Sequence, residues 1–132
     1  MMDAVLNHLR AALPNEGCAM IGGEIIGDRV VARKLYPGTN VDRSPRRFTM
    51  DAREVLTAWR EIQDRGWVLA AIAHSHPNSP ATPSPTDLAE AYYPDAVGLI
   101  VSWESDPPTT RAWSYVGHEP VEIALQIVDF PS

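Results

Sequence analysis

The chain has 132 residues, a length that fits one ordinary domain and leaves too little polypeptide for a second core. Hydrophobic residues make up 45% and charged residues 21%, a balance that excludes a disordered chain. The formal net charge of -6 disfavours nucleic acid as a partner, because an acidic protein repels a polyanion. We therefore expect one folded domain over residues 1–132 that does not bind nucleic acid.

The number of cysteines and the hydropathy of the chain indicate in which cellular compartment the protein is expected. The single cysteine, Cys18, excludes an internal disulfide and a cysteine-rich zinc finger, and a reducing compartment is the simpler assumption. The beginning of the chain lacks the cationic start and continuous apolar run of a signal peptide. No stretch approaches the roughly 20 apolar residues that span a bilayer. We expect a cytoplasmic protein without membrane contact.

Helical periodicity and turn residues divide the first half of the chain. Apolar residues recur at helical spacing before Pro14, which ends that pattern because proline cannot continue a helix. Two apolar, β-branched runs flank Gly27-Asp28, a pair typical of a hairpin turn. A second amphipathic run ends before Gly66, where a helix often needs a left-handed residue. In chain order, these patterns predict a helix over residues 3–13, strands over 18–26 and 29–36, a loop over 37–45 and a helix over 51–64.

The second half of the chain is predicted to be mainly strand. Residues 67–73 form a continuous apolar run, as in a strand buried on both faces. A proline-dense loop follows, and Asp106-Pro107-Pro108 marks a later turn. The remaining segments are predicted as a loop over 78–85, a short helix over 86–93, and strands over 96–103, 111–117 and 121–128. The fold class that follows is α+β, a mixed β-sheet flanked by helices.

The stretch that carries chemistry is His74-Ser75-His76, followed by Ser84 and Asp87. Histidines at i and i+2 on an extended strand end project to the same side, so both imidazoles can reach one metal ion. Asp87 lies on the first turn of a predicted helix, close enough in sequence to supply a third ligand. Two imidazoles and a carboxylate with one open position form a recurring catalytic zinc set. His74, His76 and Asp87 are therefore candidate zinc ligands.

A purely structural alternative exists for these same residues. Ser84 would be the N-cap of a helix, Pro85 would occupy its first position and Asp87 would complete a capping box. A lone histidine at the end of an apolar strand is more often a core or surface residue. Capping explains Ser84 and Asp87 without a metal ion, but it does not explain the pair of histidines.

The pattern His74-x-His76, seven further residues and Ser84-x-x-Asp87 resembles, residue for residue, the signature of the JAMM metalloprotease family, whose domains are also called MPN+ domains. This resemblance implies a single MPN/JAMM-type fold with a cytidine-deaminase-like arrangement. It implies that His74, His76 and Asp87 bind Zn²⁺ and that Ser84 stabilises the oxyanion. The segment around Glu16 is similar to the family's glutamate segment, which implies that Glu16 is the general base.

Two interpretations remain for each of three residues: Glu16, Cys18 and Trp103. From local sequence alone, Glu16 is a surface carboxylate after a helix-ending proline. Cys18 is either a small buried strand residue or a thiol that faces the site and competes for the open zinc position. Trp103 either packs in the core, like the other three tryptophans, or lines a substrate groove. His8 is expected on the exposed face of the first helix, and His118 in a turn.

The resemblance implies a zinc-dependent peptidase or isopeptidase that hydrolyses amide bonds. Short bacterial members resemble enzymes that cut after the C-terminal Gly-Gly of ubiquitin-like or sulfur-carrier proteins, so we expect the tail of a MoaD- or ThiS-like protein as substrate. The basic cluster Arg43, Arg46 and Arg47 is either a solvated loop or a docking loop for an acidic partner. The alternatives are a non-catalytic MPN scaffold and a RadC-like protein, although Ser75 stands where that family usually has Asn. The oligomeric state cannot be predicted.

Overall fold

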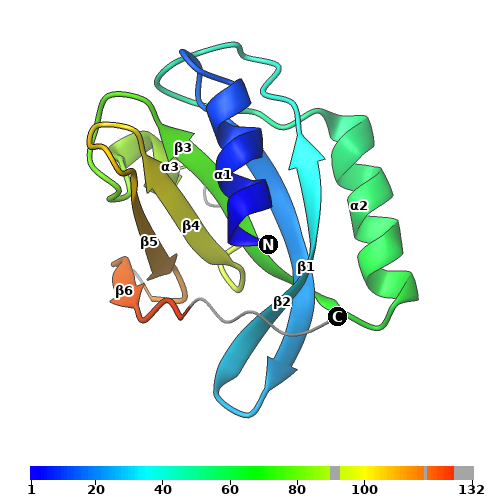
Figure 1. The fold of residues 1–132 in the computed structure, drawn as a ribbon. Helices are drawn as coiled ribbons and strands as arrows, with labels where there is room; N and C mark the ends of the chain where they lie inside the picture. Colours follow the sequence, from blue (N-terminus) through cyan, green and yellow to red (C-terminus); the bar gives the residue numbers. More distant parts are fainter. Residues whose placement is uncertain (90–92, 118, 127–132) are drawn as a thin grey trace.

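Three helices and six strands make up the part of the chain that the computed structural model describes, residues 1–89, 93–117 and 119–126 (Figure 1). The helices are α1 (Met2–Ala11), α2 (Ala52–Asp64) and α3 (Pro85–Ala89). The strands are β1 (Cys18–Ile26), β2 (Arg29–Gly38), β3 (Val68–His76), β4 (Val97–Ser102), β5 (Thr109–Ser114) and β6 (Val121–Ile123). Residues 90–92 of the predicted short helix, residues 127–128 of the predicted final strand, and His118 lie outside the described residues. The predicted final strand is too long, because β6 ends at Ile123 and residues 124–126 are not strand, and residue 93 is not helical.

All six strands form one sheet in the order β2-β1-β3-β4-β5-β6. β3 and β4 run parallel, with His74 opposite Ile100, and every other neighbouring pair is antiparallel. β3 therefore lies inside the sheet between β1 and β4, and β2 and β6 are its edges. This mixed sheet with flanking helices confirms the predicted α+β class.

The two long helices pack against opposite faces of the sheet. Val5 and Leu9 of α1 are almost fully buried in one cluster with alternate residues of β1 such as Ile21. Ile62 of α2 is buried in a second cluster with Met20, whose side chain points to the other face because side chains alternate along a strand. The core therefore has two halves, separated by the sheet.

Several element boundaries differ from those predicted. β1 has the predicted bounds, but β2 extends to Gly38 through Pro37, which a strand tolerates here because β2 is a sheet edge and needs no N–H on its open side. β3 continues past residue 73 to His76, since β1 pairs with it up to His74 and β4 up to His76. Both motif histidines are therefore held within a paired strand. β5 lies two to three residues earlier than predicted.

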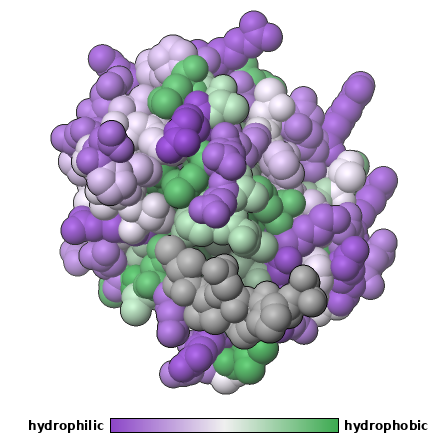
Figure 2. All heavy atoms as spheres, in the orientation of Figure 1, coloured by the Kyte–Doolittle hydropathy of each residue, from purple (hydrophilic) through white to green (hydrophobic). Residues whose placement is uncertain are grey.

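Hydrophilic side chains cover much of the face that Figure 2 draws, and apolar side chains interrupt it. Figure 2 shows apolar atoms at the bottom of the molecule, where the hairpin between β1 and β2 ends in Figure 1. Ile25, Ile26 and Val30 of this hairpin are exposed. Among the described residues, no helix is long and apolar enough to cross a membrane.

Candidate active site

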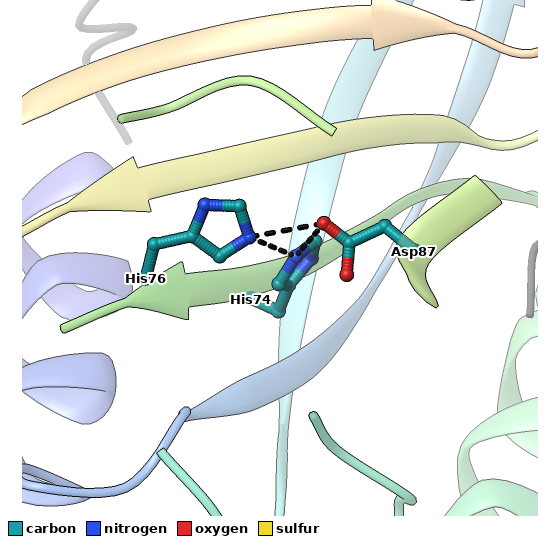
Figure 3. A group of neighbouring side chains, drawn as sticks. All are labelled: His74, His76 and Asp87. Carbon is teal, nitrogen blue, oxygen red and sulfur yellow. Dashed lines mark hydrogen bonds and ion pairs between the residues drawn. The ribbon is translucent and has the colours of Figure 1, made fainter. Parts of the chain in front are cut away.

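Three side chains that the sequence predicts as metal ligands meet on the α2 side of the sheet (Figure 3). His74 and His76 extend from the end of β3 to the same side, and their Nε2 atoms lie 3.1 Å apart. One carboxylate oxygen of Asp87, Oδ2, lies 3.2 Å from the His74 nitrogen and 3.0 Å from the His76 nitrogen. All three side chains are buried, with at most 5% of their surface exposed. The structure thus brings together three residues from two separate elements.

The chemistry of these three atoms fits a divalent cation. His76 uses its other ring nitrogen, Nδ1, to donate a hydrogen bond to the carbonyl of Pro80 at 2.7 Å, which leaves a lone pair on Nε2. That lone pair faces the Asp87 carboxylate, and two acceptors at 3.0 Å repel each other unless a proton or a metal ion lies between them. A tetrahedral zinc ion with bonds of about 2.0–2.1 Å separates its ligand atoms by about 3.3 Å. The observed spacing is close to that value.

Electrostatics around the three residues also favour a cation. Burial opposes ionisation of Asp87, but His74, His76 and the backbone N–H of Ser84 outweigh it and hold the pKa of this carboxyl well below its usual range. Burial likewise lowers the pKa of His76, but Asp87, the Pro80 carbonyl and the Glu16 charge outweigh it, so the pKa is raised. A group of buried acceptors that stabilises positive charge in this way can hold either a proton or a metal ion.

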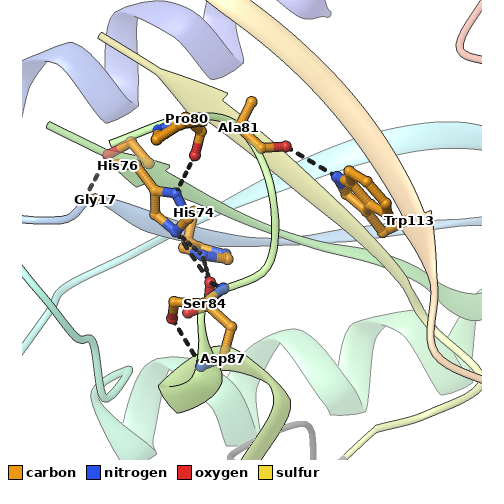
Figure 4. Close-up of polar contacts among 9 residues, drawn as sticks. Gly17, His74, His76, Pro80, Ala81, Ser84, Asp87 and Trp113 are labelled. Carbon is orange, nitrogen blue, oxygen red and sulfur yellow. Dashed lines mark hydrogen bonds and ion pairs between the residues drawn. The ribbon is translucent and has the colours of Figure 1, made fainter. Parts of the chain in front are cut away.

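Ser84 and Asp87 form the capping box that the sequence predicts at the start of α3 (Figure 4). The Ser84 N–H donates to Asp87 Oδ2 at 2.9 Å, and the Asp87 N–H donates to Ser84 Oγ at 3.0 Å. The same Asp87 oxygen faces both histidines, so capping and ligation are compatible. Because Ser84 Oγ accepts the bond from Asp87, its own hydroxyl hydrogen stays available to another acceptor.

Glu16 is buried, with 3% of its surface exposed, so the interpretation as a surface carboxylate is wrong. Its place beside the histidines is fixed through the next residue, Gly17. The Gly17 N–H donates to Ser75 Oγ at 2.9 Å, and the Ser75 N–H donates to the Gly17 carbonyl at 3.1 Å. Ser75, the residue between the two histidines, therefore ties the start of β1 to the end of β3 and holds Glu16 within electrostatic reach of the site.

The loop predicted over residues 37–45 continues to Met50, and its last part covers His74. Asn40 organises it: its Nδ2 donates to the carbonyls of Glu16 and Arg47, both at 3.0 Å, and its Oδ1 accepts from the N–H of Thr49 at 3.1 Å. The ring of Phe48 stacks on the His74 imidazole with 4.8 Å between ring centroids. Phe48 was missed because a lone aromatic residue in a loop carries no periodic signal.

An apolar pocket of about 310 Å³ adjoins the three candidate ligands. His74 and Asp87 form part of its wall. Its other lining residues are mainly apolar or aromatic and include Met20, Phe48, Met50, Val55, Ile72 and Tyr115. Tyr115 lies so close to Gly98 that a β-carbon there would come within 2.4 Å of the tyrosine ring. The site therefore has a formed, mainly apolar hollow on one side.

Three of the remaining interpretations can be decided. Cys18 is fully buried and pairs with His74 across β1 and β3, as a small strand residue would. Burial, with Glu54 and Glu16, raises the pKa of its thiol to about 12, which disfavours the thiolate that metals bind. Trp103 packs with the α1 cluster under the Arg10 guanidinium, so a place in the groove is wrong.

His8 is not on an exposed helix face as predicted. Its Nε2 atom lies 2.8 Å from the carbonyl oxygen of Cys18 and 3.1 Å from that of Gly38, so it links α1 to the ends of β1 and β2. The periodicity of α1 could not indicate this, because a histidine fits both a polar face and a partly buried one.

Comparisons with known proteins agree with this arrangement. A CysO-cysteine peptidase from Mycobacterium tuberculosis is 35% identical over 132 residues, which cover 96% of this chain and 88% of that protein. A desampylase from Haloferax volcanii is 32% identical over 105 residues, which cover 76% of this chain and 74% of that protein. The solution structure of protein DSY2949 from Desulfitobacterium hafniense has a TM-score of 0.80 at 38% identity, and the match covers 92% of this chain and 84% of that one.

The fold and the His-His-Asp group, with these relatives, define a JAMM-type hydrolase. A family model described as prokaryotic homologs of the JAB domain matches residues 1–116. The chain belongs to this prokaryotic JAB family, as the resemblance of its motif implies.

Proposed function

We propose that this chain is a zinc-dependent peptidase or isopeptidase that cuts the amide bond after the C-terminal Gly-Gly of a ubiquitin-like or sulfur-carrier protein. The observation that carries the proposal is the convergence of His74, His76 and Asp87, whose ligand atoms lie 3.0–3.2 Å apart. The names of the two relatives, a CysO-cysteine peptidase and a desampylase, support this substrate class. Because the single cysteine needs no oxidising compartment, we place the reaction in the cytoplasm.

Each residue of the site has a distinct task in this reaction. His74, His76 and Asp87 hold the zinc ion, which when bound lowers the pKa of water and polarises a carbonyl. Glu16 takes the proton of the attacking water and returns it to the leaving amine. Ser84 donates its hydroxyl hydrogen to the oxyanion, a contribution worth about 3–4 kcal/mol in other hydrolases. The burial of Glu16 within electrostatic reach of His76 supports its role, because a general base must lie close to the proton that it takes.

The pocket beside the site supports an extended chain end as substrate. Both sides of β3 are already paired, so a tail cannot join the sheet next to the histidines. The tail instead lies in the apolar pocket, whose wall reaches from Phe48 to Asp87. Glycine at the cleaved end suits this place, since it has no Cβ atom and lets the backbone approach the site closely.

The loop that carries Phe48 also supplies positive charge at the rim. Arg43, Arg46 and Arg47 are exposed, Arg47 lines the pocket, and its Nε lies 3.3 Å from an oxygen of Asp42. We expect these arginines to meet an acidic surface of the carrier protein, which raises the rate of association more than the final affinity. Carrier cleavage at low substrate concentration should therefore slow as salt is raised.

The decisive experiment uses a MoaD- or ThiS-like carrier that bears additional residues beyond its Gly-Gly. The zinc-loaded protein and the carrier are incubated and the intact mass of the carrier is followed. Loss of only the mass beyond Gly-Gly, absent with the Glu16→Gln variant, is the expected result. Cleavage of unrelated unfolded proteins at an equal rate would instead show a general peptidase.

A further inference from the structure

The loop between the histidines and Asp87 has little means of fixing its own shape by hydrogen bonds. Four of residues 77–85 are proline, the last of them being the first residue of α3, and proline has no N–H to donate. Its carbonyl groups therefore need donors from elsewhere. This loop determines where Asp87 lies relative to the histidines, so whatever holds the loop also sets the distance between the candidate ligands.

Three consecutive carbonyl groups of this loop each accept a hydrogen bond from a different strand. The carbonyl of Ser79 accepts from Ser102 Oγ of β4 at 2.6 Å. The carbonyl of Pro80 accepts from His76 of β3, as described above. The carbonyl of Ala81 accepts from Trp113 Nε1 of β5 at 3.0 Å (Figure 4). We call these three bonds the carbonyl clamp.

Two of the three donors, Ser102 and Trp113, are not candidate metal ligands, and both have a fixed orientation. Ser102 is buried, and its Oγ accepts a hydrogen bond from the Glu104 N–H at 3.2 Å, which leaves its hydroxyl hydrogen directed to the loop. Trp113 comes from the strand beyond β4 and has only one donor, the indole N–H. Both side chains are attached to paired strands, so they hold the loop against a rigid support.

We infer that Ser102 and Trp113 are positioning residues. They hold the loop so that Asp87 lies beside His74 and His76 before a metal ion binds. This inference rests on the proposed zinc site. Without the carbonyl clamp the loop adopts several conformations. The free energy of zinc binding must then offset the conformational entropy that is lost when the loop becomes ordered. Removal of either donor should therefore lower the affinity for zinc. The same effect is seen in other metal sites when a residue that hydrogen-bonds to a ligand is removed.

Zinc affinity and folding stability, measured separately, test this inference. In Trp113→Phe the aromatic ring stays and the N–H is lost; in Ser102→Ala only the hydroxyl is lost. Zinc dissociation constants are measured by competition with a chromophoric chelator, and the melting temperatures of the metal-free proteins are recorded. We expect each variant to bind zinc about 10–100-fold more weakly than the wild type. Trp67→Phe is the matched control and should bind as the wild type does, because Trp67 lies under Arg65 directly before β3, at the opposite end of that strand from the histidines.

The outcomes are separable. Unchanged zinc affinity in both folded variants, with only a lower melting temperature, would mean that the bonds merely stabilise the fold, and it would overturn the inference alone. Failure of the wild-type protein to take up zinc would overturn the proposed function and this inference with it. If Trp113→Phe does not fold, Ser102→Ala decides, because it removes a single atom.

Discussion

Glu16 and His74 lie in the same buried site, but their substitution should have different consequences. Glu16 is proposed to move a proton and His74 to hold the metal ion. The Glu16→Gln variant keeps the size of the side chain and its backbone contacts with Ser44 and Asn40. Zinc content should stay at one ion per chain, while turnover falls by about 10²–10⁴-fold. Elemental analysis and single-turnover cleavage of the carrier tail check both halves, and wild-type turnover would assign the base to another group.

Replacement of His74 should remove the metal ion rather than the base. The His74→Ala variant loses one of three ligand atoms and the ring on which Phe48 stacks. Zinc affinity should fall by more than the roughly 100-fold that loss of an outer hydrogen-bond partner costs. Equilibrium dialysis followed by elemental analysis measures this effect. Full zinc loading of the folded variant would show that the ion is bound elsewhere.

At the level of single elements, α2 offers a stability test that does not touch the chemistry. Asp51 caps this helix: its Oδ1 accepts from the N–H groups of Arg53 at 2.9 Å and Glu54 at 3.2 Å. Asp51→Ala should lower the free energy of unfolding by about 1 kcal/mol. Urea denaturation measures the change, and Asp51→Ser, which keeps a capping oxygen, should recover most of it. An equal loss in both variants would assign the effect to the charge instead of the cap.

The elements differ in how well their sequence predicts them. β1 and α2 have patterns complete within their own residues, and their bounds were predicted to within one residue. For β3, the apolar run ends at residue 73, and only the motif placed His74 and His76 on an extended strand end. Pairing with β1 and β4, which local sequence does not contain, continues the strand to His76. Although the bounds of β1 were predicted, its shifts of register beside Gly22 and Gly23 depend on pairing with β2 and β3 and were not.

The residues of the candidate site also differ in how well the sequence predicts them. His74, His76 and Asp87 have a fixed spacing in the chain, so a motif alone could predict that they meet. Trp113 lies 26 residues beyond Asp87 on another strand, and only the sheet order places it beside the loop. Contacts that depend on strand order leave no periodic pattern in a sequence.

For the molecule as a whole, the core is built without the candidate metal ligands. The two core clusters, around Leu9 and Ile62, consist of hydrophobic side chains that pack α1 and α2 on the two faces of the sheet. Removal of zinc by a chelator should therefore leave the protein folded with unchanged far-ultraviolet circular dichroism. Its melting temperature should fall, since zinc at 100 times its dissociation constant stabilises a native state by about 2.7 kcal/mol. Calorimetry with and without chelator measures the shift, and His74→Ala should show none. An unfolded metal-free protein would mean that the ion is part of the core.

The double use of Asp87 matters for judging which relatives of such a chain are active. Its carboxylate both starts α3 and faces the histidines, and Ser84 is its capping partner. In a descendant that had lost the histidines, selection for a stable helix would still retain the serine and the aspartate. Their survival is therefore weak evidence of catalysis. A buried Glu16 has no such second use in capping, so loss of this one residue would be an earlier and clearer sign that a lineage has given up the reaction.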